Sequence, residues 1–389
     1  MDAESLRMEL VSTLRGEGTL TDPVVAAAME TVPRHVFVPE VPVERAYADQ
    51  ALVTKQNADG IPTSSASQPS IVAIMLEQLS LEPGMRVLEV GAGTGYNAAL
   101  LAQIVGASEL VTTVDIAADV VERARRGLDA AGYAAVRVLC GDGGRGAPNG
   151  APYDRIIATV GAWDIPPAWF EQLAPGGILV LPLGIRGVQR SISFVNEGGV
   201  LRSKSVVPCG FMTMQGAFAG PARTYVIGTD PRLTVVVDDG RPVELPTLDA
   251  PPVRLPVAVS ATGRELYESV DPWLALREPD YGRVYLEGHY GTGLGMVADG
   301  SLTHLAPFEE GVDRQVDAVE LAVLGYGPSA ASLAERLATS LLAWESAGRP
   351  SMEKLKIDVY PAGTPDSELA GRAVVDKHHT RLALTLPTD

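Results

Sequence analysis

Cysteine is scarce in this chain of 389 residues, which contains only Cys140 and Cys209. Two cysteines cannot build the disulfide framework of a small secreted domain, so we expect a reducing, cytoplasmic location. Long apolar runs are also missing, since no stretch approaches the ~18 residues that span a bilayer. The first residues lack the basic segment and apolar core of a signal peptide. We therefore expect no association with a membrane.

Basic residues are outnumbered, with 31 Lys and Arg against 48 Asp and Glu and a formal net charge of −17. This charge repels nucleic acids at long range, so we expect no nucleic-acid substrate. No cluster of His and Cys has the spacing of a metal site, and we expect His378 and His379 to lie on the solvated surface. Hydrophobic residues make up 46% of the chain, which supports globular cores, and the length predicts about two to three domains.

Residues 87–96 are the most informative segment, because an apolar strand there ends in a glycine-rich turn and a helix follows. This pattern is typical of the nucleotide-binding unit that begins a doubly wound α/β domain. Gly91, Gly93 and Gly95 have the spacing G-x-G-x-G, whereas dinucleotide sites use G-x-G-x-x-G, which disfavours an NAD-dependent oxidoreductase. Glu89 precedes the turn. The combination favours S-adenosylmethionine (SAM), which has no pyrophosphate and whose positive amino end can meet the carboxylate.

Acidic residues also end the next two predicted strands. Asp115 follows the strand at 110–114, where this fold places the carboxylate that binds the ribose hydroxyls. The strand at 136–140, in which we expect Cys140 to be buried, leads into Gly141-Asp142-Gly143. There Asp142 can accept the adenine amino group while a backbone N–H meets a ring nitrogen. The candidate cofactor residues are Ser64, Glu89, Gly91, Gly93, Asp115, Ile116, Asp142 and Gly143.

The hydrophobic pattern divides the chain into three parts. Strands and helices alternate between 86 and 182, and the strands are nearly continuous apolar runs, as in a parallel sheet covered on both faces. The expected fold is α/β: a doubly wound, Rossmann-like, SAM-dependent methyltransferase domain with N-terminal helices and a C-terminal α+β domain. The expected parts are an N-terminal helical cap with the substrate segment (1–80), a SAM-binding core (81–216) and a C-terminal accessory domain (217–389).

Individual segments carry further expectations. We expect helices at 2–16, 22–31 and 329–347, an extended segment at 32–39, irregular chain at 46–66, an antiparallel hairpin at 190–206, and strands at 355–360 and 381–386. Phe211 to Gln215 either close over the acceptor or form an edge strand. Trp163 either stacks on a peptide ring or packs internally. The arginines that either pair with an acidic peptide or lie solvated are Arg34, Arg45, Arg186 and Arg190.

A segment rich in hydroxyl groups, 62–69, precedes a predicted helix. Methyl transfer to a carboxylate needs no strong base, because the acceptor is already an anion, and the enzyme mainly positions the two bound groups. The N–H groups at the start of a helix favour an anion there. Ser67 lies at the helix entry, where it either caps the helix or contacts the acceptor, and one serine can do both.

Several of these segments together resemble the protein-L-isoaspartate O-methyltransferase family. The resemblance covers roughly residues 5–216 and rests on Ser65 to Ala73, Val87 to Tyr96, Gly141-Asp142-Gly143, Gly177 to Gly184, Val32-Pro33-Arg34 and Phe37-Val38. It implies a SAM-dependent methyltransferase that esterifies the side carboxyl of an aspartyl-type residue in a peptide. The active-site serine of the family falls on Ser67, which favours the catalytic interpretation of this residue.

The sequence also departs from the short repair enzymes of the family, at 54–64, at Asn97, at Ala162-Trp163-Asp164 and in its C-terminal domain. These features resemble a branch associated with ribosomally made peptides such as lanthipeptides and graspetides. There the enzyme esterifies an ordinary aspartate of a modified precursor peptide, and the neighbouring backbone nitrogen attacks the ester to give a succinimide. This is the leading hypothesis, and the accessory domain would then recognise the peptide. The alternatives are a general isoaspartyl repair enzyme and a non-catalytic binding protein on a methyltransferase fold.

Overall fold

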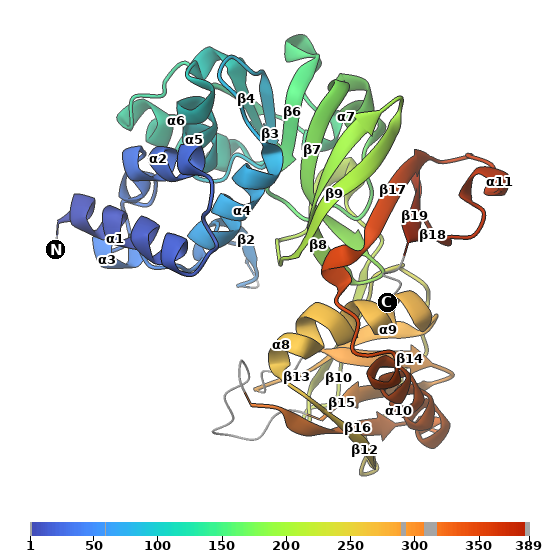
Figure 1. Cartoon of the computed structure of the whole chain (residues 1–389). Helices are drawn as coiled ribbons and strands as arrows, with labels where there is room; N and C mark the ends of the chain where they lie inside the picture. Colours follow the sequence, from blue (N-terminus) through green and yellow to red (C-terminus); the bar gives the residue numbers. More distant parts are fainter. Residues whose placement is uncertain (1, 59, 289–292, 307–316, 386–389) are drawn as a thin grey trace. The chain divides into compact units, whose positions relative to one another are not determined.

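The computed structural model describes residues 2–58, 60–288, 293–306 and 317–385 (Figure 1). The chain forms two compact units. The first unit comprises Met1–Leu183, Arg190–Ala219 and Lys356–Leu384, and the second comprises Gly184–Gln189, Gly220–Leu355 and Thr385–Asp389. Among the described residues, no helix has the length and hydropathy that a bilayer crossing requires.

A ten-stranded sheet with the order β18-β19-β17-β9-β8-β7-β6-β3-β4-β5 is the backbone of the first unit. Five of its strands are mutually parallel: β3 (Val87–Val90), β4 (Val111–Asp115), β5 (Arg137–Cys140), β6 (Tyr153–Ala158) and β7 (Leu173–Ile185). Strands β3, β4 and β5 follow one another toward one edge of the sheet, and β6 then lies on the other side of β3. This order confirms the doubly wound topology. The carboxyl ends of β3, β4 and β6 therefore flank the switch point at which such folds bind ligands.

Helices pack beside this parallel part of the sheet (Figure 1). They are α1 (Ala3–Gly16), α2 (Pro23–Thr31), α4 (Pro69–Leu79), α5 (Tyr96–Val105) and α6 (Ala118–Ala130). Their apolar faces share one core with β3 and β4, in which Leu14, Leu76 and Leu101 are completely buried. Asp22 caps α2 by accepting the Val24 N–H at 2.7 Å, as the sequence predicts for an Asp-Pro helix start.

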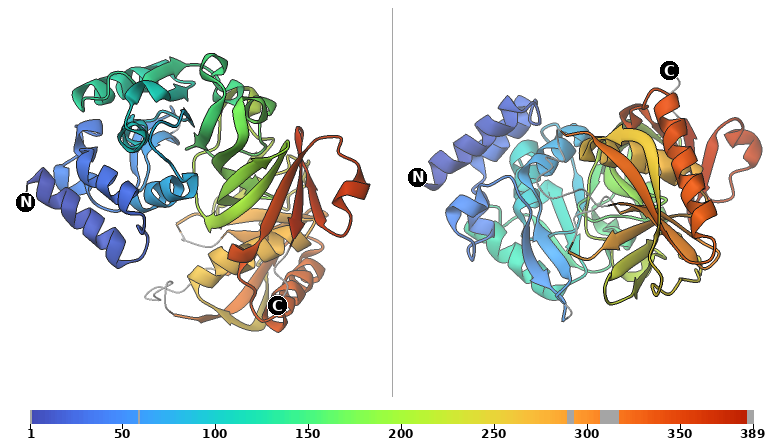
Figure 2. Two further views of the ribbon diagram at one scale, coloured as in Figure 1. Left: turned by 45° about the horizontal axis from the view of Figure 1, so that its top comes forward. Right: turned by 90° about the horizontal axis from the view of Figure 1, so that it is seen from below.

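The antiparallel part of the sheet contains strands from two distant segments (Figure 2). The expected hairpin is confirmed as β8 (Val188–Glu197) and β9 (Val200–Pro208). Strand β17 (Lys356–Pro361) pairs with β9, and β18 (Ala373–Asp376) and β19 (Thr380–Thr385) extend the sheet further. A single accessory domain over 217–389 therefore does not describe the structure, because residues 356–384 complete the sheet of the first unit. Strand β17 satisfies the backbone groups that β9 would otherwise expose at a sheet edge.

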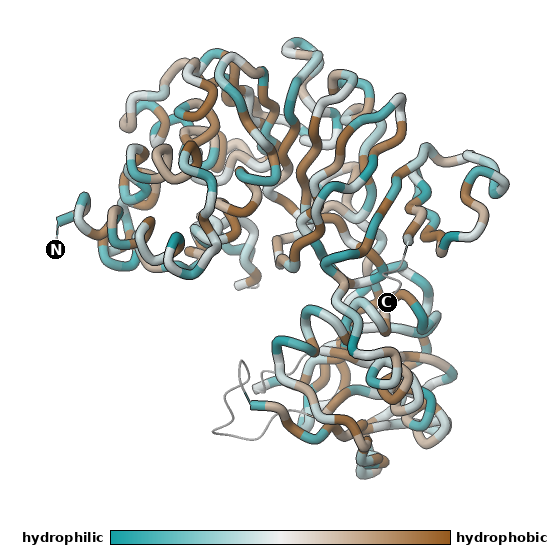
Figure 3. Tube along the Cα trace, viewed as in Figure 1, coloured by the Kyte–Doolittle hydropathy of each residue, from teal (hydrophilic) through white to brown (hydrophobic). Residues whose placement is uncertain are grey.

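The second unit is built on a seven-stranded antiparallel sheet of order β10-β11-β13-β14-β15-β16-β12. The strands are β10 (Arg223–Ile227), β11 (Leu233–Val237), β12 (Val253–Ala261), β13 (Tyr281–Leu286), β14 (Leu294–Ala298), β15 (Ser301–Leu305) and β16 (Val319–Tyr326). Helices α8 (Gly263–Glu265), α9 (Asp271–Arg277) and α10 (Ala330–Ser346) accompany it, and Leu337, Leu341 and Trp344 of α10 are completely buried in its core. In Figure 3, brown hydrophobic stretches alternate with white and teal ones along the chain of this unit. The unit has the expected α+β composition.

The N-terminal region differs from the sequence-based expectation in two places. Strands β1 (Leu52–Gln56) and β2 (Pro62–Ala66) form an antiparallel pair where irregular chain was expected. The sequence does not predict these strands because their composition is polar. Residues Arg34–Phe37 form a 3₁₀ turn instead of continuing extended, since the Val36 N–H bonds the Pro33 carbonyl at 3.0 Å. A short helix, α3 (Val43–Ala46), follows.

Candidate functional site

The glycine-rich turn between β3 and α5 has a backbone that only glycine adopts easily. Gly91, Gly93 and Gly95 have φ values of +101°, +51° and +90°, all in the left-handed region. A Cβ atom on Gly91 would lie 2.7 Å from Thr159 Oγ1, and one on Gly95 would lie 2.9 Å from the Ala124 carbonyl oxygen. The turn therefore needs glycine both for its conformation and for its close neighbours.

Asp115, the last residue of β4, lies directly beside this turn. Its carboxylate accepts the backbone N–H of Gly93 at 3.2 Å and that of Ala117 at 3.1 Å. The next residue, Ile116, is an exposed large hydrophobic residue, 42% accessible. A carboxylate and an exposed apolar side chain thus stand together at the carboxyl end of the sheet, an arrangement that suits the ribose and base of a nucleoside.

Glu89 lies within β3, two residues before the turn begins at Gly91, and is completely buried. Its carboxylate accepts hydrogen bonds from Asn97 Nδ2 at 2.8 Å and from Thr113 Oγ1 at 2.5 Å. Burial is the main cause that raises the pKa of Glu89, to about 7. Because Glu89 is completely buried and its carboxylate binds Asn97, the structure makes Glu89 a support for Asn97. Its direct contact with a cofactor stays a prediction.

Asp142 and Gly143 lie over the ends of β3 and β4. A Cβ atom on Gly143 would lie 2.4 Å from Val90 Cγ1 and 3.7 Å from Val114 Cγ1. Asp142 accepts the Gly144 N–H through Oδ1 at 3.0 Å and the Ala217 N–H through Oδ2 at 2.8 Å. The structure therefore brings Asp142 to the same edge of the sheet as Asp115, as their positions at successive strand ends predict.

Residues 209–219, which we call the crossing segment, lie over this edge. The Gly161 N–H bonds the Met212 carbonyl at 2.7 Å, and the Met214 N–H bonds the Gly161 carbonyl at 2.8 Å. Further along, Ala217 reaches Asp142. Phe211 to Gln215 are thus not an edge strand, and the segment runs from the end of β6 to the loop that follows β5. The contact of Ala217 with Asp142 carried no signal in the sequence.

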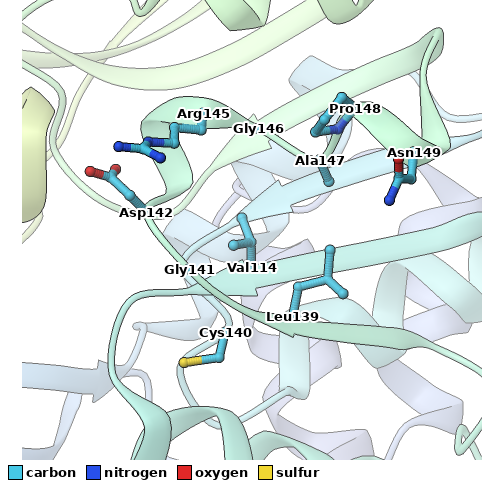
Figure 4. Close-up of a pocket in the computed structure, with 10 residues that line it drawn as sticks. All are labelled: Val114, Leu139, Cys140, Gly141, Asp142, Arg145, Gly146, Ala147, Pro148 and Asn149. Carbon is cyan, nitrogen blue, oxygen red and sulfur yellow. The ribbon is translucent and has the colours of Figure 1, made fainter.

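A pocket of about 280 Å³ lies next to Asp142 (Figure 4). Val114 and Leu139 form its floor, and Ala147, Pro148 and Asn149 line one side. Cys140 also lines it and is exposed, which contradicts the expectation of a buried cysteine. The reason is that Cys140 is the last residue of β5, where the sheet ends and the chain turns outward.

The hydroxyl-rich segment packs against the glycine turn. The Ser65 carbonyl oxygen lies 3.4 Å from the position that a Cβ of Gly93 would occupy. Ser64 Oγ accepts a hydrogen bond from Thr54 Oγ1 at 3.2 Å, which holds this candidate cofactor residue within the β1–β2 pair. The structure therefore brings the hydroxyl-rich segment 62–69, which we call the acceptor segment, into contact with the glycine turn, although the two are far apart in the sequence.

Ser67 is not a helix cap. The N-cap residue of helix α4 is Gln68, and its side chain makes no capping hydrogen bond. Asp49 takes this role instead, because its Oδ1 accepts the Ser70 N–H at 2.8 Å and its Oδ2 accepts Gln68 Nε2 at 2.8 Å. The half-buried Ser67 side chain makes no hydrogen bond to any residue that the structure describes. Its hydroxyl is thus available to a ligand, whereas the helix end expected to attract an anion is occupied by Asp49.

Two of the candidate arginines are buried and do not lie solvated. Arg34 is completely buried and Arg190 is 3% exposed, whereas Arg45 is exposed. Lys377 stands over the ring of Trp163 at 4.1 Å from its centroid. No group of three or more metal-ligating side chains occurs within the described ranges.

The C-terminal strands join the loop after β6 through Asp164. This buried carboxylate accepts the His379 N–H at 2.6 Å and Thr380 Oγ1 at 2.5 Å. The His379 ring also lies against that of Phe218, with centroids 5.6 Å apart. His379 is therefore held within the first unit through both its backbone and its ring.

The fold and this arrangement define a SAM-dependent methyltransferase: glycine turn, acidic residues at neighbouring strand ends, and a free serine beside them. Residues 5–218, more than half of the chain, match the family model described as "Protein-L-isoaspartate(D-aspartate) O-methyltransferase (PCMT)". The chain belongs to this family of carboxyl O-methyltransferases, whose acceptors are proteins and peptides.

Similar curated proteins carry the same name. Protein-L-isoaspartate O-methyltransferase of Hyperthermus butylicus is 42% identical over 221 residues, 54% of this chain and 89% of the relative. That of Methanopyrus kandleri is 42% identical over 212 residues, 54% of this chain and 91% of the relative. A solved structure titled protein-L-isoaspartate O-methyltransferase has a TM-score of 0.53 at 24% identity and covers 90% of this chain and 96% of its own. At this identity the last comparison supports the fold alone.

Proposed function

We propose that this protein is a general repair enzyme that transfers a methyl group to the free carboxylate of isoaspartyl residues in peptides and proteins. The observation that carries the proposal is the Ser67 hydroxyl, which has no hydrogen-bond partner among the described residues and stands next to the segment that contacts the glycine turn. The names of the relatives support the isoaspartyl acceptor.

The cofactor would lie along the carboxyl ends of β3, β4 and β5. When bound, SAM supplies a methyl group on a positively charged sulfur. Asp115 would bind the ribose hydroxyls, with Ile116 against the base, and Asp142 with the Gly143 N–H would bind the adenine. Gly91 and Gly93, with Ser64 on the facing segment, would surround the methionine half, and Glu89 would support it through Asn97.

Ser67 would position the acceptor. Its hydroxyl can donate a hydrogen bond to one carboxylate oxygen and so orient the other toward the methyl group. The acceptor oxygen is already anionic, and no residue has to remove a proton from it. Holding two groups in reacting geometry can supply roughly 7–11 kcal/mol of a barrier, so positioning is a sufficient role for this site.

Esterification of an ordinary aspartate in a ribosomally made, modified precursor peptide is the narrower alternative, and the comparisons favour it less. The additional unit does not by itself favour this alternative, because a solved structure of similar fold covers 90% of this chain, well beyond residues 5–218. The role of the unit in binding peptide stays a prediction.

Two peptides of identical sequence, one with isoaspartate and one with ordinary aspartate, distinguish these functions. We expect the isoaspartyl peptide alone to gain one methyl group in the presence of SAM, as seen by mass spectrometry, followed by loss of methanol to the succinimide. Methylation of the aspartyl peptide alone would support the precursor-peptide alternative. If neither peptide reacts and calorimetry detects no SAM binding, the result supports the non-catalytic binding protein instead.

A further inference from the structure

Arg34 is the most deeply buried cation next to the acceptor segment. Its side chain is 0% exposed. Three backbone carbonyl groups from different segments hold the guanidinium: Nε donates to Ala46 at 2.8 Å, Nη1 to Ser67 at 2.9 Å, and Nη2 to Gln50 at 3.4 Å. One arginine thus joins the 3₁₀ turn, the chain after α3 and the residue proposed to hold the acceptor.

This cation forms no ion pair within the described part of the chain. Burial lowers the pKa of Arg34, and the negative charge of Asp49, whose two oxygens bind the start of α4, opposes this shift without forming an ion pair with Arg34. The face of the guanidinium lies 5.3 Å from the ring centroid of Tyr96, and a ring is a weaker partner for a cation than a carboxylate. Burying a charge without an ion partner is costly, and arginine stays protonated at any physiological pH.

The neighbours of Arg34 place this positive charge between the two halves of the site. Tyr96 is the first residue of α5, directly after the glycine turn. Ser67 lies on the acceptor side, and its carbonyl is bound directly by Nη1. A carboxylate held by the Ser67 hydroxyl would lie on the residue whose carbonyl the guanidinium binds, and the guanidinium itself is completely buried. Coulomb attraction in such surroundings is several times stronger than in water.

We propose that Arg34 is a positioning residue whose guanidinium fixes the Ser67 backbone and whose unpaired charge favours an anionic acceptor over a neutral one. The inference rests on the proposed role of Ser67. A neutral donor could hold the three carbonyl groups, whereas a cation in addition attracts a carboxylate more strongly than an uncharged group of the same shape.

The test compares an isoaspartyl peptide with the same peptide in which the reacting carboxylate is a carboxamide, which acts as an uncharged competitive ligand. The measured quantity is the inhibition or dissociation constant of the amide peptide divided by that of the acid peptide, both determined with the cofactor bound. For Arg34→Gln we expect this preference for the acid to fall about tenfold or more, with a smaller loss of amide binding because the Ser67 carbonyl loses its donor. For Arg34→Lys, which keeps the charge, we expect most of the preference to remain while kcat falls.

Arg155→Gln is the matched control. Arg155 also binds backbone carbonyl groups, those of Leu79 at 2.7 Å and Ser80 at 2.9 Å, but it does so at the opposite end of α4. We expect this variant to lose stability and to keep the wild-type preference for the acid. A purely structural role for Arg34 would predict the same behaviour in Arg34→Gln.

An unchanged preference in Arg34→Gln overturns the inference while leaving the proposed function intact. Equal loss of acid and amide binding also overturns it. If Arg34→Gln does not fold, Arg34→Lys decides: a preference lost despite the retained charge contradicts the proposal. Failure of the wild-type protein to methylate the isoaspartyl peptide contradicts the proposed function instead, so the two failures are distinguishable.

Discussion

The carboxylate of Asp115 accepts the backbone N–H of Gly93 at 3.2 Å, so the acidic end of β4 is bonded directly to the glycine turn after β3. The two residues are 22 positions apart in the sequence. A carboxylate that orients the turn and also faces the proposed ribose site links cofactor affinity to the shape of the turn.

Replacing Asp115 with alanine should therefore weaken SAM binding. Each lost hydrogen bond to a charged acceptor is worth about 1.5–3 kcal/mol, so the dissociation constant should rise at least about tenfold. Isothermal titration calorimetry measures this. Asp119→Ala is the control, because Asp119 pairs with Lys55 at the surface at 2.6 Å, and its affinity for SAM should match the wild type. Equal affinity in both variants would remove Asp115 from the ribose site.

Replacing Ser67 with alanine should reduce turnover and leave SAM affinity nearly unchanged. The hydroxyl has no partner within the described chain, so its removal costs little stability, while one hydrogen bond to the anionic acceptor is lost. We expect kcat to fall about tenfold or more. Steady-state kinetics with the isoaspartyl peptide measure the change, and Ser70→Ala serves as the neighbouring control. A full-rate Ser67→Ala enzyme would refute the role of Ser67.

Gly95→Ala should destabilise the protein more than Gly132→Ala. Both glycines have left-handed backbones, with φ of +90° and +88°, so each variant pays about 1–2 kcal/mol for its conformation. Only the Cβ at position 95 meets a close neighbour, the Ala124 carbonyl oxygen at 2.9 Å, whereas nothing lies within 4 Å at position 132. The excess cost should be about 1–3 kcal/mol. Urea unfolding of both variants measures it, and equal losses would contradict the tight packing of the turn.

The buried Glu89 should make stability depend on pH. Burial, the largest cause, raises its pKa from 4.5 to about 7, so between these values the folded protein keeps a proton that the unfolded chain has released. Stability should therefore fall as pH rises through this window, by up to about 1.4 kcal/mol per pH unit, and level off above about pH 7. Glu89→Gln should lack this contribution. Unfolding free energies of both proteins at about pH 5, 6 and 7.5 test this, and parallel curves would contradict it.

Asp164→Ala should loosen the C-terminal strands of the first unit. The carboxylate accepts hydrogen bonds from Thr380 Oγ1, the His379 N–H and the Ile165 N–H, and its loss leaves these donors unpaired at a cost of about 3 kcal/mol or more. Hydrogen–deuterium exchange should become faster in β18 and β19. Asp376, whose exposed carboxylate pairs with Arg381, provides the control, because Asp376→Ala should change exchange little. Unchanged protection in Asp164→Ala would show that strand pairing alone holds these strands.

The local features of the site were predictable from the sequence. The positions of Gly91, Gly93 and Gly95 follow from a backbone conformation that only glycine adopts easily, and the strands that end at Asp115 and before Asp142 follow from short apolar runs. Each of these signals lies within a few residues of the feature that it predicts.

The tertiary structure alone decided the rest, because the partners are far apart along the chain. Asp49 caps α4 from 21 residues away and so leaves Ser67 free, and Arg34 is buried because it binds a carbonyl group 33 residues away. The joining of β17 to β9 places Asp358 opposite Arg202, 156 residues away, and neither strand by itself indicates this partner. The sequence by itself determined the glycine turn and the strand ends, since their geometry is local. Only folding determined which polar groups remained without partners, because that depends on every segment that packs around them.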